Sequence, residues 1–182
     1  CKSIVQILVL SPVPLPASER TEKDPCVSGG GPCTCNPEPL AGFFVIFYIG
    51  EGETVYDELL DAYKTWKSSG KSRKAFLETA AQIEGLYVPA FYDPEYNTDG
   101  TLKSFVPNNI NAPATVKKQV VMDVTDASYP MNPVVPFIKA TQDRVVLEIQ
   151  RGCIRGCRFC QAGMIYRPTR ERSVDQLKDN SG

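Results

Sequence analysis

"DRVVLEIQRGCIRGCRFCQ", residues 143–161, joins an apolar segment directly to three cysteines. Its first eight residues, 143–150, are rich in β-branched and aliphatic side chains, and this pattern predicts a strand. Cys153, Cys157 and Cys160 follow with the spacing C-x3-C-x2-C, and the chain contains no histidine. We therefore expect a strand that leads into a thiol-rich loop.

The residues after the cysteines predict a loop and then a helix. The segment QAGMIYRPTRER (161–172) is basic and loop-like. A carboxylate or phosphate site is one interpretation of its arginines, but we favour exposed loop charges at Arg167, Arg170 and Arg172. Ser173 is a favoured N-cap residue, and Gln176 three positions later completes a capping box. A helix is therefore expected from residue 174.

The spacing of the three thiols indicates a metal-binding loop. Three thiolates can hold three irons of a [4Fe–4S] cube and leave the fourth iron open, whereas an electron-transfer cluster usually has four cysteines. A structural zinc site also needs four ligands, and here only Cys26, Cys33 or Cys35 could complete one. We favour the iron–sulfur cluster and interpret those three cysteines as ordinary small residues. Gly152 and Gly156 would relieve crowding and let backbone amides approach the sulfurs.

Upstream of residue 143 the pattern predicts an α/β arrangement. FFVIFYIG (43–50) is a continuous apolar run, which is typical of a strand covered on both faces, as in a parallel sheet. Gly70 ends an amphipathic helical pattern. The other expected elements are a strand over 4–10, helices over 51–70 and 72–82, a strand over 87–92, a hairpin over 95–105 that turns at Asp99-Gly100, and a strand over 116–124.

Composition excludes several classes of function. With 42% hydrophobic and 23% charged residues the chain is of globular type, and its net charge of −1 gives no electrostatic reason to expect nucleic acid or an anionic membrane as partner. No apolar run approaches the roughly 20 residues that span a bilayer. Seven cysteines is an odd number, which favours free thiols in a reducing compartment. We therefore expect a soluble, cytoplasmic protein.

The cysteine loop, with the aromatic Phe159 before its last cysteine, resembles that of the radical S-adenosylmethionine (radical SAM) superfamily. The longer segment LEIQRGCIRGCRFCQAGMIYRPTRERS (147–173) resembles the start of the radical SAM core in a family that also has a cobalamin-binding domain. Three upstream segments are similar to that family's cobalamin-type domain and linker: GGPCTCNPEPLAGFF (30–44), IGEGE (49–53) and YVPAFYDPEYNTDGTLKSF (87–105). The resemblance favours a helix at 4–10, against the local pattern.

This resemblance implies an α/β fold in three parts. Residues 1–66 would be the C-terminal part of a doubly wound cobalamin-binding-like domain, 67–142 an α+β linker with a hairpin, and 143–182 the first strand and helix of a partial (β/α) radical SAM barrel. The family's Asp-x-His-x-x-Gly cobalamin loop and its later barrel segments have no counterpart here. We therefore expect the chain to be a fragment of a longer protein.

The resemblance also implies an activity and its residues. Cys153, Cys157 and Cys160 would ligate a [4Fe–4S] cluster whose open iron binds S-adenosylmethionine, with Phe159 on the side of that cofactor. Reductive cleavage would give a 5′-deoxyadenosyl radical that abstracts hydrogen from a substrate, and an electron donor such as flavodoxin or ferredoxin would be the partner. Gly30 and Gly31 would lie near the nucleotide tail of cobalamin, unless they form a plain strand-to-loop turn. A non-enzymatic electron-transfer module and an inactive truncated chain remain alternatives.

Overall fold

The computed structural model describes residues 2–125, 137–139, 141 and 146–179, and the chain separates into two units, Cys1–Val120 and Val121–Gly182. The helices and strands of the first unit are α1 (Lys2–Leu10), β1 (Ser28–Gly29), β2 (Ile46–Tyr48), α2 (Tyr56–Ser69), α3 (Arg73–Ala80), β3 (Leu86–Tyr87), β4 (Tyr92–Tyr96) and β5 (Leu102–Pro107). Its 3₁₀ turns are Ala17–Glu19, Pro32–Cys35, Glu38–Leu40, Gly52–Thr54 and Pro89–Phe91. The second unit contains β6 (Gln150–Arg151), α4 (Ala162–Ile165), β7 (Arg170–Glu171) and α5 (Val174–Asp179).

The core of the first unit is built on β2, the predicted apolar strand. This strand is buried throughout and lies between β1, which it pairs in parallel, and β3, which it pairs antiparallel. Phe47 and Leu86 are each 1% exposed. The small sheet is therefore mixed, whereas the sequence pattern favoured a parallel one, and burial of its large side chains supplies the main driving force for this unit.

Helices α2 and α3 form a hairpin that packs its aromatic side chains together. Gly70 ends α2 in the left-handed conformation with a φ of 67°, as the sequence predicts. The rings of Trp66 and Phe76 stack with their centroids 5.2 Å apart, and Tyr63 meets Phe76 edge-on at 5.5 Å. Both predicted helices are confirmed, although α2 starts at Tyr56, after a 3₁₀ turn over Gly52–Thr54.

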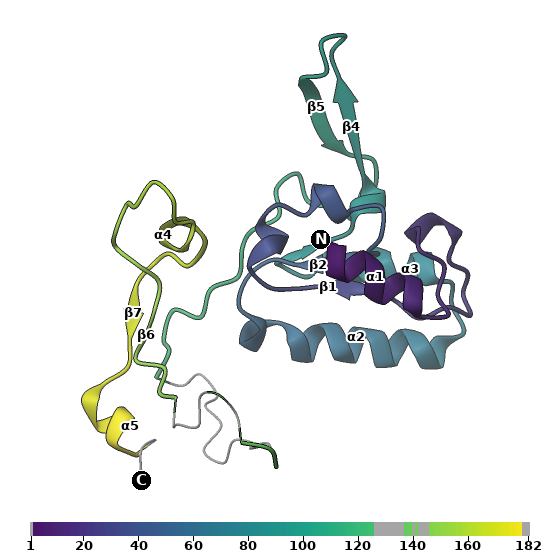
Figure 1. The fold of residues 1–182 in the computed structure, drawn as a ribbon. Helices are drawn as coiled ribbons and strands as arrows, with labels where there is room; N and C mark the ends of the chain where they lie inside the picture. The colour runs from purple at the N-terminus through teal and green to yellow at the C-terminus, as the bar shows by residue number, and fades with distance from the viewer. Residues whose placement is uncertain (1, 126–136, 140, 142–145, 180–182) are drawn as a thin grey trace. The chain divides into compact units, whose positions relative to one another are not determined.

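Strands β4 and β5 form the predicted hairpin, which projects from the rest of this unit (Figure 1). Gly100 has a φ of 83°, and its amide donates to the Asn97 carbonyl at 3.0 Å. The Asp99 carboxylate accepts hydrogen bonds from the amide and hydroxyl of Thr101 at 2.9 and 2.6 Å. The turn is therefore where Asp99-Gly100 predicts it, and the strands extend three residues before residue 95 and two beyond residue 105.

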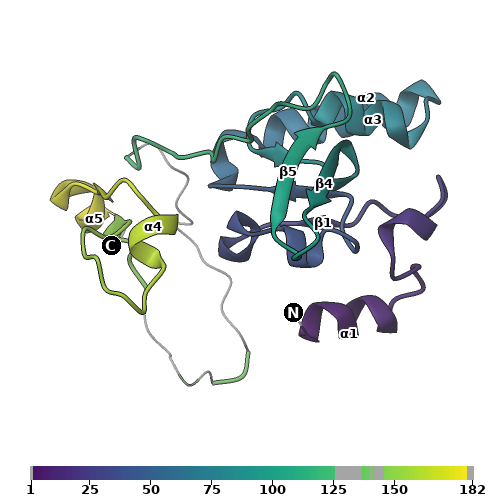
Figure 2. The ribbon, with the colours of Figure 1, turned by 90° about the horizontal axis from the view of Figure 1, so that it is seen from above.

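Three predictions for the first unit are wrong in part or whole. Residues 4–10 lie in helix α1, which Figure 2 shows set apart from α2 and α3; this outcome agrees with the family resemblance and not with the local pattern. The strand over 87–92 is interrupted by the 3₁₀ turn Pro89–Phe91. The strand over 116–124 is absent from those residues, and only Gln119 forms a bridge, to Gly50. Gln119 meets the chain just beyond β2, where its amide donates to the Ile49 carbonyl and its carbonyl accepts from the Glu51 amide, both at 3.0 Å.

The second unit has more regular structure after the cysteines than the sequence predicts. Residues 161–172 are not a continuous loop, because they contain α4 and also β7, which pairs antiparallel with β6. Of the predicted strand over 143–150, residues 143–145 lie outside the described residues, 146–149 are not in a strand, and Gln150 begins β6. Helix α5 has the predicted capping box, with the Ser173 amide donating to Gln176 Oε1 at 3.1 Å and the Gln176 amide donating to Ser173 Oγ at 3.3 Å.

Candidate functional site

The three cysteines of the motif lie in an irregular loop between β6 and α4. Cys157 and Cys160 are exposed and Cys153 is half-buried, and all three thiols are free. The backbone amide of Arg155 donates to the sulfur of Cys153 at 3.4 Å, and the Cys160 amide donates to the Cys157 carbonyl at 3.1 Å. An amide directed at sulfur is the kind of contact that tunes the potential of a thiolate-bound cluster.

Two glycines allow this loop to fold closely against neighbouring backbone. Gly152 has a φ of 91°, and a Cβ at this position would lie 2.6 Å from the Tyr166 carbonyl oxygen. A Cβ on Gly163 would lie 2.4 Å from the carbonyl oxygen of Arg155. At Gly156, by contrast, no atom of the described residues, its two chain neighbours aside, lies within 4 Å of the Cβ position. The expected relief of crowding is therefore confirmed at Gly152 and not at Gly156, and sequence reasoning missed Gly163.

The loop fits a metal cluster by the chemistry of its donors. Three thiols within eight residues are soft ligands of the kind that iron–sulfur clusters take. In the part of the chain that the structure describes, however, no group of three or more His, Cys, Asp or Glu side chains converges as metal ligands would. The donors are thus present on one accessible loop without being arranged around a common centre.

The cysteines outside the loop have different environments. Cys33 and Cys35 are exposed on the turn Pro32–Cys35, and Cys26 is partly buried against the core of the first unit. Burial raises the pKa of the Cys26 thiol above its ordinary value. Since the thiolate is the form that binds metal, this raised pKa makes Cys26 a poor ligand and fits the interpretation of an ordinary core residue.

A charged cluster of Glu148, Arg151 and Arg172 supports the base of the loop. Arg151 Nε donates to Glu148 Oε1 at 2.8 Å, and Arg172 Nη2 donates to Glu148 Oε2 at 2.9 Å. The Arg172 side chain is only 2% exposed. Hydrogen bonds from Arg151, and next from Arg172, lower the pKa of the Glu148 carboxyl. The cluster therefore holds a carboxylate between two cations beside the β6–β7 pair.

The prediction of exposed loop charges is wrong for two of the three arginines. Arg167 is exposed, but Arg170 and Arg172 are each 7% exposed. Arg170 donates to the backbone carbonyls of Val121 and Pro168 at 2.6 and 2.9 Å. The sequence contains one signal of this burial. Arg170 and Arg172 are two residues apart, and this spacing is typical of side chains on one face of a strand.

The remaining predicted site residues are Phe159, Gly30 and Gly31. Phe159 is 92% exposed, so its ring shields no neighbour in the described structure. Gly31 has a φ of 100°, and the Cβ position of Gly30 lies 3.6 Å from the hydroxyl of Tyr56. A Cβ on Gly29 would come within 2.8 Å of the Phe47 ring. The glycine run thus forms a strand-to-loop turn with one close packing contact, and a role in binding cobalamin stays a prediction.

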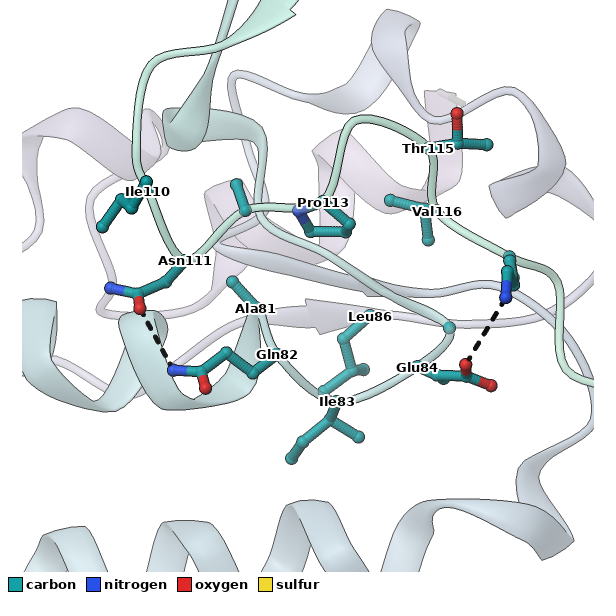
Figure 3. Close-up of a pocket in the computed structure, with 13 residues that line it drawn as sticks. Ala81, Gln82, Ile83, Glu84, Leu86, Ile110, Asn111, Pro113, Thr115 and Val116 are labelled. Atoms are coloured by element: carbon teal, nitrogen blue, oxygen red, sulfur yellow. Dashed lines mark hydrogen bonds and ion pairs between the residues drawn. The ribbon is translucent and has the colours of Figure 1, made fainter.

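A cavity of about 380 Å³ in the first unit lies between residues 81–86 and 110–117 (Figure 3). Gln82 and Asn111 point toward one another there, with a hydrogen bond of 3.3 Å from the Gln82 amide to Asn111 Oδ1. Glu84 and Lys117 form an ion pair at 3.9 Å, and both are well exposed. None of its described lining residues is a buried charged group, so we assign this cavity no chemistry.

Comparison with known proteins agrees with the motif. Residues 1–89 match the family model described as the N-terminal region of radical SAM proteins. An uncharacterized protein of Methanocaldococcus jannaschii is 31% identical over 149 residues, which cover 81% of this chain and 26% of that protein. The chain thus spans about a quarter of the length of this curated relative.

No solved structure matches, and no described helix has both the length and the apolar character of a membrane crossing. Residues 1–89 are thus similar to the N-terminal region of radical SAM proteins.

Proposed function

We propose that this chain is part of a radical SAM enzyme and that Cys153, Cys157 and Cys160 hold its [4Fe–4S] cluster. The observation that carries the proposal is the presence of the C-x3-C-x2-C loop in the same chain as a radical SAM N-terminal match. Three cysteine ligands leave one iron for the amino and carboxylate groups of S-adenosylmethionine. Nothing in the comparisons supports cobalamin, so the proposal rests on the cluster and S-adenosylmethionine alone.

The chain's own residues position the thiolates and limit access of water. Gly152 and the β6–β7 pair fix the start of the loop, while the Arg155 amide stabilises the Cys153 thiolate by a hydrogen bond. Ile154 and Phe159 are apolar and 81% and 92% exposed. We propose that these side chains exclude water from the site once S-adenosylmethionine is bound.

When bound, a reduced cluster of this type supplies the electron that cleaves S-adenosylmethionine to methionine and a 5′-deoxyadenosyl radical. Such a radical would abstract a hydrogen atom from an organic substrate. A small electron-transfer protein such as flavodoxin or ferredoxin would deliver the electron at the exposed loop.

The test is anaerobic reconstitution with iron and sulfide, followed by EPR of the dithionite-reduced chain with and without S-adenosylmethionine. We expect a [4Fe–4S]⁺ signal that changes when S-adenosylmethionine is added. Cys157→Ala should abolish the signal, and the matched controls Cys33→Ala and Cys35→Ala, which also remove exposed thiols, should keep it.

Three results would contradict the proposal in different ways. Bound zinc without acid-labile sulfide would mean a structural metal site. A cluster signal lost in Cys33→Ala or Cys35→Ala would mean that the ligand set extends beyond the loop, as in a closed electron-transfer cluster. A signal that is unchanged by S-adenosylmethionine would mean that this chain alone does not bind it.

A further inference from the structure

A second cavity in the first unit combines apolar walls with two buried arginines. It has a volume of about 420 Å³ and lies between the 3₁₀ turn Ala17–Glu19, the segment 38–45, the start of α3 and residues 89–94. Its apolar walls include Phe44, Leu77, Pro89 and Tyr92, and its cationic groups are Arg20 and Arg73. A concave apolar surface with a few convergent polar groups is typical of small-molecule sites.

The Arg20 guanidinium is held in place by neutral acceptors. Its Nε donates to the Pro14 carbonyl at 2.8 Å, its Nη2 to the Leu15 carbonyl at 2.8 Å, and its Nη1 to the Phe43 carbonyl at 2.7 Å. The residue is 9% exposed. These bonds fix the side chain without neutralising its charge, so Arg20 contributes a stationary positive charge at the cavity.

The Arg73 guanidinium has hydrogen-bond donors that the protein does not use. Arg73 is 8% exposed, and its Nη2 donates to the backbone carbonyl of Asp24. Its Nε and Nη1 are buried and have no hydrogen-bond partner among the described residues. The Glu22 carboxylate is nearby, but it accepts from the Arg73 backbone amide, at 2.8 and 2.9 Å, and not from the guanidinium. Buried donors without partners are rare in folded proteins and indicate a missing acceptor.

The lining of the cavity carries two cations, Arg20 and Arg73, and one carboxylate, Glu38. Glu38 lines the cavity and accepts a hydrogen bond from the hydroxyl of Tyr87. The Asp24 carboxylate is engaged by the amide and hydroxyl of Thr21, at 2.7 and 2.9 Å. Among the described residues, neither Arg20 nor Arg73 forms an ion pair with a carboxylate. Burial and then the charge of Arg73 lower the pKa of Arg20, and the Asp24 carboxylate opposes them only in part. A bound anion would offset the repulsion and the desolvation of both cations.

We propose that this cavity binds a small organic anion, with its carboxylate or phosphate group at Arg73 and its apolar part against Phe44, Leu77 and Tyr92. Arginine is well suited to such a ligand, because its charged N–H groups form strong hydrogen bonds to carboxylate and phosphate oxygens. The site uses none of the cysteines and does not depend on the proposed radical chemistry.

The test titrates the 182-residue chain with three probes: benzoate, inorganic phosphate and benzamide, the uncharged analogue of benzoate. Binding is measured by calorimetry and by the Nε–H resonances of ¹⁵N-labelled arginine. We expect saturable binding of benzoate or phosphate with a shift of one protected Nε–H resonance, and binding of benzamide at least about tenfold weaker than that of the anion. Benzoate alone would identify a carboxylate ligand with an apolar body, and phosphate alone a phosphorylated one.

Arg73→Met should weaken anion binding by at least about tenfold. The matched control is Lys74→Met, which removes the same charge from the next residue of α3, where the side chain is 73% exposed, and it should leave binding unchanged. If circular dichroism shows that Arg73→Met does not fold, Arg73→Lys, which retains the charge but not the Nε and Nη1 donors, should show the same loss. No saturable binding of either anion, equal binding of benzamide, or an equal loss in Lys74→Met would overturn the proposal.

Discussion

The Arg172 guanidinium donates a hydrogen bond of 2.9 Å to the Glu148 carboxylate, and the Arg172 side chain is 2% exposed. Arg172 follows β7 and Glu148 precedes β6, so their contact closes the base of the cysteine loop from both sides. Its strength therefore affects the loop that carries the three thiols.

Replacing Glu148 by Gln should destabilise the second unit. The substitution keeps the shape of the side chain but removes the negative charge that accepts from Arg151 and Arg172, and we expect a loss of about 2 kcal/mol, reduced from the fully buried case because Glu148 is partly exposed. The measurement is denaturant unfolding, observed by a signal that comes from the second unit. Glu95→Gln is the control, since Glu95 pairs with Lys103 at an exposed position and its loss should change stability by less than about 1 kcal/mol. Equal losses of stability in the two variants would contradict the conclusion that the Glu148 carboxylate stabilises the second unit.

The same carboxylate predicts a dependence of stability on pH. The pKa of Glu148 is lowered in the folded state by its hydrogen bonds to Arg151 and Arg172. Its contribution is therefore fully present above the ordinary pKa of 4.5 and is lost as the pH falls through the lowered folded value. Subtracting the unfolding free energies of Glu148→Gln from those of the unsubstituted chain across the acid range should reveal this loss. A difference that stays constant with pH would show that Glu148 carries no stabilising charge.

Gly152→Ala should distort the cysteine loop, whereas Gly156→Ala should not. At position 152 the positive φ is unfavourable for alanine, and its Cβ would collide with the carbonyl oxygens of Tyr166 and Pro168. We expect a loss of about 1–3 kcal/mol, together with a lower yield of reconstituted cluster. Apart from its two chain neighbours, no residue that the structure describes lies within 4 Å of the Cβ position of Gly156. Iron content and thermal unfolding of the two variants provide the comparison, and similar values for both would refute the role given to Gly152.

Elements with local signals could be predicted from the sequence. The hairpin is identified by Asp99-Gly100, helix α2 by its amphipathic pattern and Gly70, and the start of α5 by Ser173 and Gln176. The cysteine motif is likewise a local feature of the sequence, and the thiolate ligation that its spacing indicates stays a prediction.

Features that depend on distant partners could not be predicted. Residues 4–10 are too short an apolar run to distinguish helix from strand. The burial of Arg170 depends on the carbonyl of Val121, and the cavity depends on the approach of Arg20 and Arg73, which the sequence separates widely. Such contacts arise from tertiary packing, and no local residue pattern encodes them.

The cysteines should differ in their rates of alkylation, and cluster assembly should change that order. Burial raises the pKa of Cys26, so less thiolate is available at neutral pH and iodoacetamide should modify it more slowly than the exposed thiols. Cys157 and Cys160 are exposed, as are Cys33 and Cys35, so all four should react readily before reconstitution. After reconstitution, mass spectrometry should find the two loop cysteines protected and Cys33 and Cys35 still reactive. Protection of Cys33 and Cys35 to the same degree would assign the metal to a ligand set other than the C-x3-C-x2-C loop.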